Sequence, residues 1–171
     1  NTSAYGSPSN TQLAYFKAGL DQWTATLTAL GISLVYTTSS PDVAVNWLTS
    51  AEMAAATGSS SVLGYASTNK NIYMRTDLDN STIQSTAVHE FGHMLGIWSH
   101  SFDSADIMYP YDLGQTELTN RDIATIKDFL YELTATYDMH DLSGPSTAGS
   151  GIIIPEIRTY YTSRGCVIQY S

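Results

Sequence analysis

Apolar residues recur at every third or fourth position in two stretches of the chain. The first stretch runs from Ser9 to Leu30, just before Gly31, and its apolar positions are Leu13, Phe16, Leu20, Trp23, Leu27 and Leu30. This period predicts one amphipathic helix that ends at Gly31. The second stretch follows the capping pair Thr119-x-x-Asp122, and its apolar positions are Ile123, Ile126, Leu130, Leu133 and Tyr137. The pattern predicts another helix, which begins at Thr119.

The segments between these two helices have other patterns. Short runs rich in β-branched and aromatic residues predict strands, namely Ile32–Thr37, Val43–Leu48, Ser61–Ser67 and Asn71–Arg75. Ser50–Thr57 is expected to be a helical turn or a loop. Ser81-x-x-Gln84 has the form of a capping box and predicts a helix from Ser81 to Gly96, with a loop over 97–117. A helix followed by short strands and two more helices predicts an α+β fold with a small mixed sheet.

Composition narrows the classes of partner. The chain has 171 residues, with 7 Lys and Arg against 16 Asp and Glu, and a net charge of −9. Because a chain with this negative charge repels polyanions, we expect no nucleic acid partner and no binding to an anionic membrane surface. Apolar runs are only a few residues long, so we expect no membrane span. Cys166 is the single cysteine, which leaves no intrachain disulfide and no multi-cysteine zinc site.

One short motif carries the chemistry. His89-Glu90-x-x-His93 lies within the helix predicted from Ser81. Positions i and i+4 share a helix face, so both imidazoles can reach one Zn²⁺ ion, with Glu90 beside the metal as a proton acceptor. Gly96 permits a turn that returns a third ligand to the ion. The competing interpretation is two histidines packed in the core or on the helix surface.

Around this motif the chain resembles the metzincin zinc endopeptidases, whose signature is H-E-x-x-H-x-x-G-x-x-H followed by a Met-turn. Within them it is most similar to the matrixin catalytic domain, through Asp106-Ile107-Met108-Tyr109-Pro110 and Leu118-Thr119-x-x-Asp122. The resemblance is tight over residues 87–131. It implies a metzincin-like α+β fold with a backing helix, an active-site helix and a C-terminal helix.

The third ligand departs from the family pattern by one position. The family's third histidine would fall at Ser99, whereas this chain has His100. The eight-residue step from His100 to Met108 agrees with the matrixin pattern, which indicates a one-residue insertion in the turn after Gly96, with His100 as ligand. Asp103 is the alternative third ligand.

The resemblance also implies the surroundings of the metal. Met108 would form the base beneath the three imidazoles. Gly64, Tyr65 and Ala66 resemble the family's edge strand above the cleft, whose free N–H and C=O groups would pair with an extended peptide. Pro110 and Tyr111 resemble the wall of the pocket for the side chain that follows the scissile bond.

The Ser/Gly/Pro-rich stretch Ser143–Gly151 reads as a linker, and Ile152–Ile154 and Val167–Tyr170 have β character. We therefore predict a catalytic domain over 1–141 and a linker and tail over 142–171 that packs on or regulates it. A thiolate at Cys166 could in principle hold the open zinc position, although a small apolar residue in a terminal strand is the favoured interpretation.

The function expected from the resemblance is a zinc-dependent endopeptidase with one catalytic Zn²⁺ ion, a peptide or protein substrate, a monomeric state and secretion, although no signal peptide is visible. Ca²⁺ at Asp77 and Asp79 is conceivable, but a solvated turn is favoured. One alternative is a latent or inactive zinc-holding domain that binds proteins. A structural surface domain with incidental histidines is the other.

Overall fold

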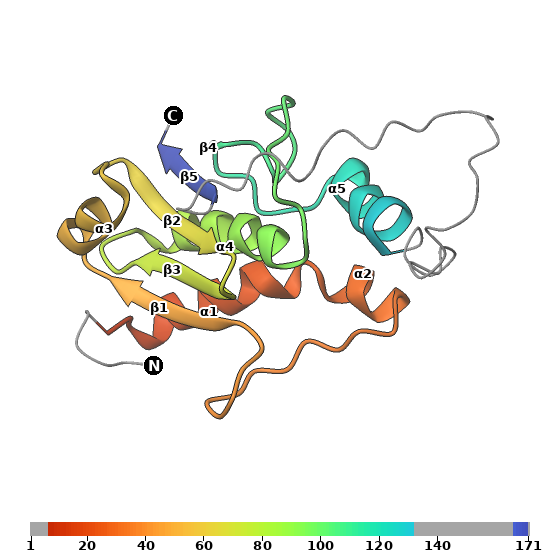
Figure 1. The fold of residues 1–171 in the computed structure, drawn as a ribbon, viewed down its shortest axis with the longest axis horizontal. Helices are drawn as coiled ribbons and strands as arrows, with labels where there is room; N and C mark the ends of the chain where they lie inside the picture. Colours follow the sequence, from red (N-terminus) through yellow and green to blue (C-terminus); the bar gives the residue numbers. More distant parts are fainter. Residues whose placement is uncertain (1–6, 132–165, 171) are drawn as a thin grey trace, which may run out of the picture.

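The computed structural model describes residues 7–131 and 166–170 of the chain. The helices are α1 (Asn10–Asp21), α2 (Thr24–Ala29), α3 (Ser50–Thr57), α4 (Asn80–Met94) and α5 (Asn120–Ala124), which continues as the π-helix η1 (Thr125–Tyr131). The strands are β1 (Ala44–Leu48), β2 (Val62–Ser67), β3 (Asn71–Arg75), β4 (Tyr111–Asp112) and β5 (Cys166–Tyr170). The fold is mixed α+β, as predicted (Figure 1).

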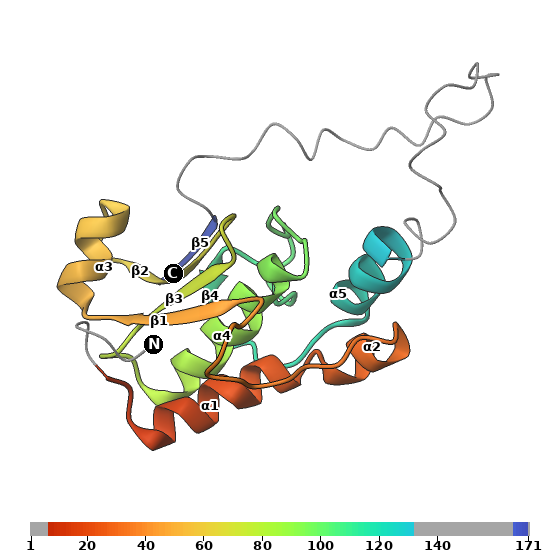
Figure 2. The same cartoon turned by 60° about the horizontal axis from the view of Figure 1, so that its bottom comes forward.

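The strands form one mixed sheet in the order β1-β3-β2-β5-β4. β1 is parallel to β3 and β4 is parallel to β5, whereas β2 is antiparallel to both of its neighbours. α4 packs on one face of the sheet, and α1 packs against α4 on the side away from the strands (Figure 2). The described residues include no helix with the length and apolar character that crossing a membrane requires.

The main core lies between α1, α4 and the sheet. Trp23 is fully buried there, and its indole Nε1 donates a hydrogen bond of 3.0 Å to the carbonyl of Val88 on α4. α1 approaches α4 closely at Gly19, where an added Cβ would lie 2.6 Å from the carbonyl oxygen of Gln84. This approach fixes α4, the helix that carries the two motif histidines, against a rigid support.

The first predicted helix is two helices in the structure. α1 ends at Asp21 and α2 begins at Thr24, because the amides of Gln22 and Trp23 bond three residues back, to the carbonyls of Gly19 and Leu20. Such bonds tighten the chain into a turn. Apolar side chains on both sides of the break still face the core, so the period in the sequence continues across it.

Residues 32–37 form no strand, contrary to prediction. Ile32 and Leu34 pack against the core, whereas Val35 and Tyr36 are exposed. The alternation of apolar and polar residues thus reflects an extended segment that is half buried but pairs with none of the described strands. The other three predicted strands are present as β1, β2 and β3.

Helix starts agree with the sequence at Ser9 and Thr119 and differ at Ser81. The Thr119–Asp122 capping box is confirmed, and Ser50–Thr57, which was expected to be a helical turn or a loop, is a helix. The predicted cap at Ser81 is wrong, since Asp79 caps α4 and accepts a hydrogen bond of 2.9 Å from the amide of Thr82. A carboxylate is a stronger acceptor for these amides than a hydroxyl, and it complements the positive end of the helix.

The C-terminal strand changes the sheet edge that the sequence predicts. β5 confirms the β character of Val167–Tyr170, and it pairs with β2 at Gly64, Tyr65 and Ala66. The edge expected at these three residues is therefore covered by β5. The stretches Ser143–Gly151 and Ile152–Ile154 lie outside the described residues, so the boundary at residue 141 stays a prediction.

Candidate metal centre

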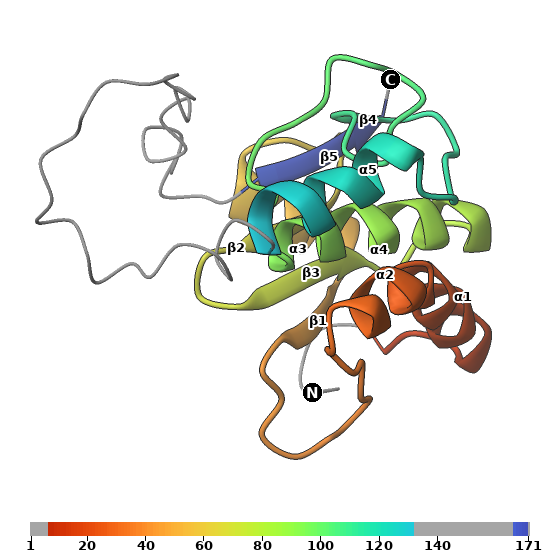
Figure 3. The same ribbon diagram turned by 90° about the vertical axis from the view of Figure 1, so that its right-hand side faces the viewer.

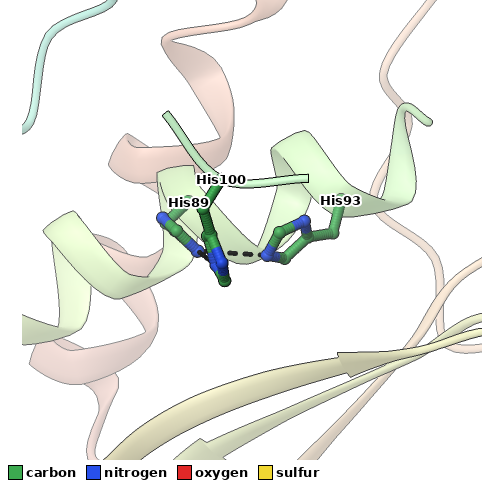
Figure 4. Close-up of side chains that lie close together, drawn as sticks. All are labelled: His89, His93 and His100. Atoms are coloured by element: carbon green, nitrogen blue, oxygen red, sulfur yellow. Dashed lines mark hydrogen bonds between the residues drawn. The ribbon is translucent and has the colours of Figure 1, made fainter. Parts of the chain in front are cut away.

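α4 carries two buried histidines on one face. His89 and His93 are both 0% exposed, and their ring centroids lie 4.7 Å apart in an edge-to-face arrangement. The four-residue spacing places them one turn apart, as the motif predicts. Their Nε2 atoms lie 3.0 Å apart (Figure 4).

Backbone carbonyls set the tautomers of both rings. The Nδ1 atom of His89 lies 2.7 Å from the carbonyl oxygen of Ile107, and that of His93 lies 2.5 Å from the carbonyl oxygen of Ile97. Because a carbonyl oxygen only accepts, each Nδ1 must carry the proton and donate it. Each neutral ring then presents an unprotonated Nε2, which is the atom available to a metal.

His100 completes the cluster. Its Nε2 lies 3.2 Å from the Nε2 of His89, and the ligand atoms of all three histidines lie within 4.8 Å of one another. Two Nε2 lone pairs at 3.0 Å cannot hydrogen-bond to each other when both Nδ1 atoms hold the protons. A shared cation resolves this arrangement, and three imidazoles are a donor set that suits Zn²⁺. The residues therefore fit a zinc ion.

The environment keeps the imidazoles neutral. Burial lowers the pKa of His89 well below 6.5, and the neighbouring His93 and His100 lower it further. Burial also lowers the pKa of His93, to about 3, and that of His100. Neutral imidazole is the form that binds metals.

The turn after α4 returns the chain to the cluster. Gly96 has a φ of +112°, in the region that favours glycine, and the amide of Ile97 bonds back to the carbonyl of Gly92 at 3.1 Å. Ser99, the position where the family pattern has its histidine, is exposed, and His100 reaches the other two rings. The turn thus accommodates one additional residue.

A buried carboxylate holds the segment that follows His100. Asp106, with its side chain 2% exposed, accepts hydrogen bonds from Ser101 (2.6 Å), Thr119 (2.8 Å) and Arg121 (2.7 and 3.0 Å). The amide of Ser101 also bonds to the carbonyl of Met108 at 2.7 Å. The two ends of the 101–108 loop are thereby tied to each other and to the start of α5.

The same arrangement fixes the tautomer-setting carbonyl of Ile107. The amide of Ile107 donates to the carboxylate of Asp122 at 3.2 Å, and this carboxylate also caps α5. Ile97, Ile107, Asp106, Arg121 and Asp122 all support the cluster, and sequence reasoning gave none of them this role. Asp106 and Asp122 stand inside the segments that carry the matrixin resemblance, which was the one available signal.

The alternative ligand, Asp103, lies elsewhere. Its carboxylate pairs with Arg121 at 2.6 Å and accepts from the amide of Ala105 at 3.0 Å. Among the described residues, the group of three or more possible metal ligands consists of His89, His93 and His100, without Asp103.

Glu90 and Met108 lie within the same buried region. Glu90 follows His89 on α4 and is 0% exposed. Met108 is 3% exposed and packs against α4 at Gly92, where an added Cβ would lie 2.5 Å from the Met108 sulfur. The absence of a side chain at Gly92 therefore gives the Met108 side chain its space against α4.

The residues expected to bind substrate lie on two strands. On β2, Gly64 and Ala66 are buried, and the Tyr65 ring stacks on Tyr73 with centroids 4.4 Å apart. Pro110 immediately precedes β4, and Tyr111, 42% exposed, is its first residue. β5 lies between these two strands, so both sets of residues lie next to β5 in the sheet.

The two carboxylates considered for Ca²⁺ have structural partners. Asp77 forms a two-pronged ion pair with Arg75 at 2.7 and 2.9 Å, and hydrogen bonds from this guanidinium lower the pKa of Asp77. Asp79 caps α4. Both carboxylates are thus engaged in contacts within the chain.

Comparison with known proteins agrees with this geometry. A search of individual curated proteins finds no match. A sequence model of the matrixin family matches residues 2–132, which include the three histidines, Glu90, Met108 and every described element except β5. The chain therefore belongs to the matrixin family, a family of zinc-dependent peptidases.

Proposed function

We propose that the chain is a zinc-dependent endopeptidase in which His89, His93 and His100 hold one zinc ion and Glu90 is the general base. The observation that carries this proposal is the convergence of three Nε2 atoms, two of which carry no proton because the Nδ1 of the same ring donates to a backbone carbonyl. In these tautomers the Nε2 atoms of His89 and His93, 3.0 Å apart, cannot hydrogen-bond to each other, and a cation shared with His100 would account for their approach.

Each residue has a distinct role in peptide hydrolysis. Zinc, when bound, supplies a Lewis acid that polarises the scissile carbonyl and lowers the pKa of water. Glu90 accepts the proton of the attacking water and then donates it to the leaving amine. Its full burial keeps this carboxylate in a medium of low dielectric, where its charge acts strongly on a nearby proton. Met108, whose sulfur lies against α4 at Gly92, would form the base beneath the histidines.

The proposed substrate is a peptide or protein bound in an extended conformation. Gly64, Tyr65 and Ala66 on β2 would pair with its backbone, and Pro110 and Tyr111 would border the side chain after the scissile bond. Strand pairing is a general mode of peptide recognition, and both segments lie next to the position that β5 occupies in the sheet. Secretion and a monomeric state accompany this proposal as expectations of the family.

The test compares two glutamates. Glu90→Gln removes the proton acceptor and keeps the volume, so peptide cleavage should fall about 10²- to 10⁴-fold while zinc stays bound at one ion per chain. The matched control, Glu117→Gln, changes an exposed glutamate and should cleave like the original protein. Cleavage by Glu90→Gln at the control rate would refute the assignment of the base.

A second candidate function rests on β5. β5 pairs with both β2 and β4, where a substrate peptide would pair. The alternative is therefore a latent domain that holds zinc but cleaves no peptide. A chain with full zinc content that cleaves no peptide in a random library would favour this alternative over the peptidase.

A further inference from the structure

β5 lies between the two segments proposed to bind substrate. Ala66, Tyr65 and Gly64 on β2 pair antiparallel with Cys166, Val167 and Ile168. On its other side, β5 runs parallel to β4, with Gln169 opposite Tyr111 and Tyr170 opposite Asp112. Figure 3 shows β5 extending across the molecule above α4, which it also contacts.

We propose that Cys166–Tyr170 occupies the position between β2 and β4 where a substrate peptide would pair, and that it competes with extended peptides for these two strands. An extended segment held by main-chain pairing on both sides has the backbone arrangement of a peptide bound by strand addition. This inference rests on the proposed function of these two strands, and it goes further by naming their occupant.

β5 is an addition to the family domain. The matrixin match ends at residue 132, whereas β5 begins at Cys166. β1, β3 and β2 already form a continuous sheet, and both β2 and β3 contact α4. Removal of β5 therefore leaves that sheet intact and exposes the edge of β2 together with the two-residue strand β4. An exposed edge of this kind is a ready template for another strand.

Attachment to the same chain favours the tail over free peptides. A tethered segment acts at an effective concentration on the order of millimolar. A peptide of the same sequence that binds with a Kd of about 0.1 mM would then be outcompeted roughly tenfold by the attached tail. Release of the tail should therefore raise the affinity of β2 and β4 for an added peptide by about this factor.

Backbone chemistry suggests how to release the tail within the full-length chain. Successive N–H groups of a strand point to opposite edges, so prolines at two adjacent positions that both lie opposite β2 remove one donor from the ladder with β2. Val167→Pro with Ile168→Pro applies this to β5. Thr147→Pro with Ala148→Pro is the matched control, since it adds two prolines to the same tail outside the paired strand. Both chains also carry Glu90→Gln, so that cleavage does not interfere with binding.

The probe is a fluorescent synthetic peptide of residues 163–171 that carries Cys166→Ser, which tests main-chain pairing without the thiol. Its Kd is measured by anisotropy with zinc present, and a cooperative thermal transition is required of each chain. We expect about tenfold tighter binding to the Val167→Pro/Ile168→Pro chain than to the control. Equal affinity for the two folded chains, or binding to neither, would overturn the proposal.

A second measurement needs no proline. In uniformly ¹⁵N-labelled Glu90→Gln protein, amide exchange at 166–170 is compared with and without the same peptide at millimolar concentration. Displacement of the tail should accelerate this exchange at least about fivefold, whereas unchanged exchange would identify β5 as a permanent strand. Neither measurement depends on catalysis. Binding that follows these expectations in a protein that cleaves nothing would refute the peptidase and retain this inference.

Discussion

Asp106 provides the sharpest test of how the metal cluster is held in place. Asp106→Asn keeps the size of a side chain that is only 2% exposed, but it replaces a carboxylate oxygen by an NH₂ group that cannot accept. The variant loses about one hydroxyl bond and the two-pronged contact with Arg121. Hydrogen bonds to charged groups contribute about 1.5–3 kcal/mol each, and the exposure of Arg121 reduces its share. We therefore expect the free energy of unfolding to fall by about 2–3 kcal/mol.

The assay is urea unfolding at pH 7 with zinc present, combined with a competition measurement of zinc affinity. Loosening the 101–108 loop should also weaken zinc binding about tenfold, because the carbonyl of Ile107 then holds His89 less firmly. Asp103→Asn is the matched control, because Asp103 also pairs with Arg121 but is exposed, and it should leave both quantities close to the original values. Equal effects of the two substitutions would refute the reasoning.

The same carboxylate predicts a dependence on pH. Burial alone would raise the pKa of Asp106, but the hydrogen bonds from Arg121, Ser101 and Thr119 outweigh it and lower the pKa below its ordinary value. A group with a lowered folded pKa stabilises the fold above its unfolded pKa of about 3.9, and this stabilisation is lost as the pH falls through the folded value. The difference in stability between the original protein and Asp106→Asn should therefore shrink below about pH 4. A difference that stays constant down to pH 2 would contradict this assignment.

Two further substitutions test the packing of α4. Gly92→Ala places a Cβ 2.5 Å from the Met108 sulfur and should lower the free energy of unfolding by about 1–3 kcal/mol, measured in urea. Adding Met108→Ala should recover most of this loss, whereas additive losses of the two substitutions would contradict the contact. Asp79→Ala removes the cap of α4 and should cost about 1 kcal/mol, whereas Ser81→Ala should cost less, because Ser81 caps nothing and only donates to Asp79. A larger loss from Ser81→Ala than from Asp79→Ala would instead support a helix that begins at Ser81, as the sequence predicts.

Local rules account for what the sequence predicts correctly. The spacing of His89 and His93 fixes their common helix face, and the position of Gly96 predicts the turn that brings back His100. The capping pair at Thr119 predicts the start of α5, and β-rich runs predict β1, β2 and β3. In each case the interaction lies within a few residues of the signal, so the pattern contains the information.

The features that the sequence does not predict depend on contacts between residues far apart in the chain. Every residue has a carbonyl, so nothing marks that of Ile107 as the acceptor for His89, 18 residues away in the chain. The pairing of Asp106 with Arg121 depends on how a loop meets a helix. The β character of Val167–Tyr170 is local, but its place beside β2, about a hundred residues earlier, depends on the free edge of a completed sheet.

The central claim is that His89, His93 and His100 bind one zinc ion, and the most direct measurement is the zinc content and zinc affinity of three purified chains. The original protein should hold one zinc per chain, Asp103→Ala should hold it equally, and His100→Ala should lose it or bind it far more weakly. Unchanged zinc in His100→Ala together with loss in Asp103→Ala would move the third ligand to Asp103. No zinc in any of the three chains after zinc is supplied would contradict the metal centre itself.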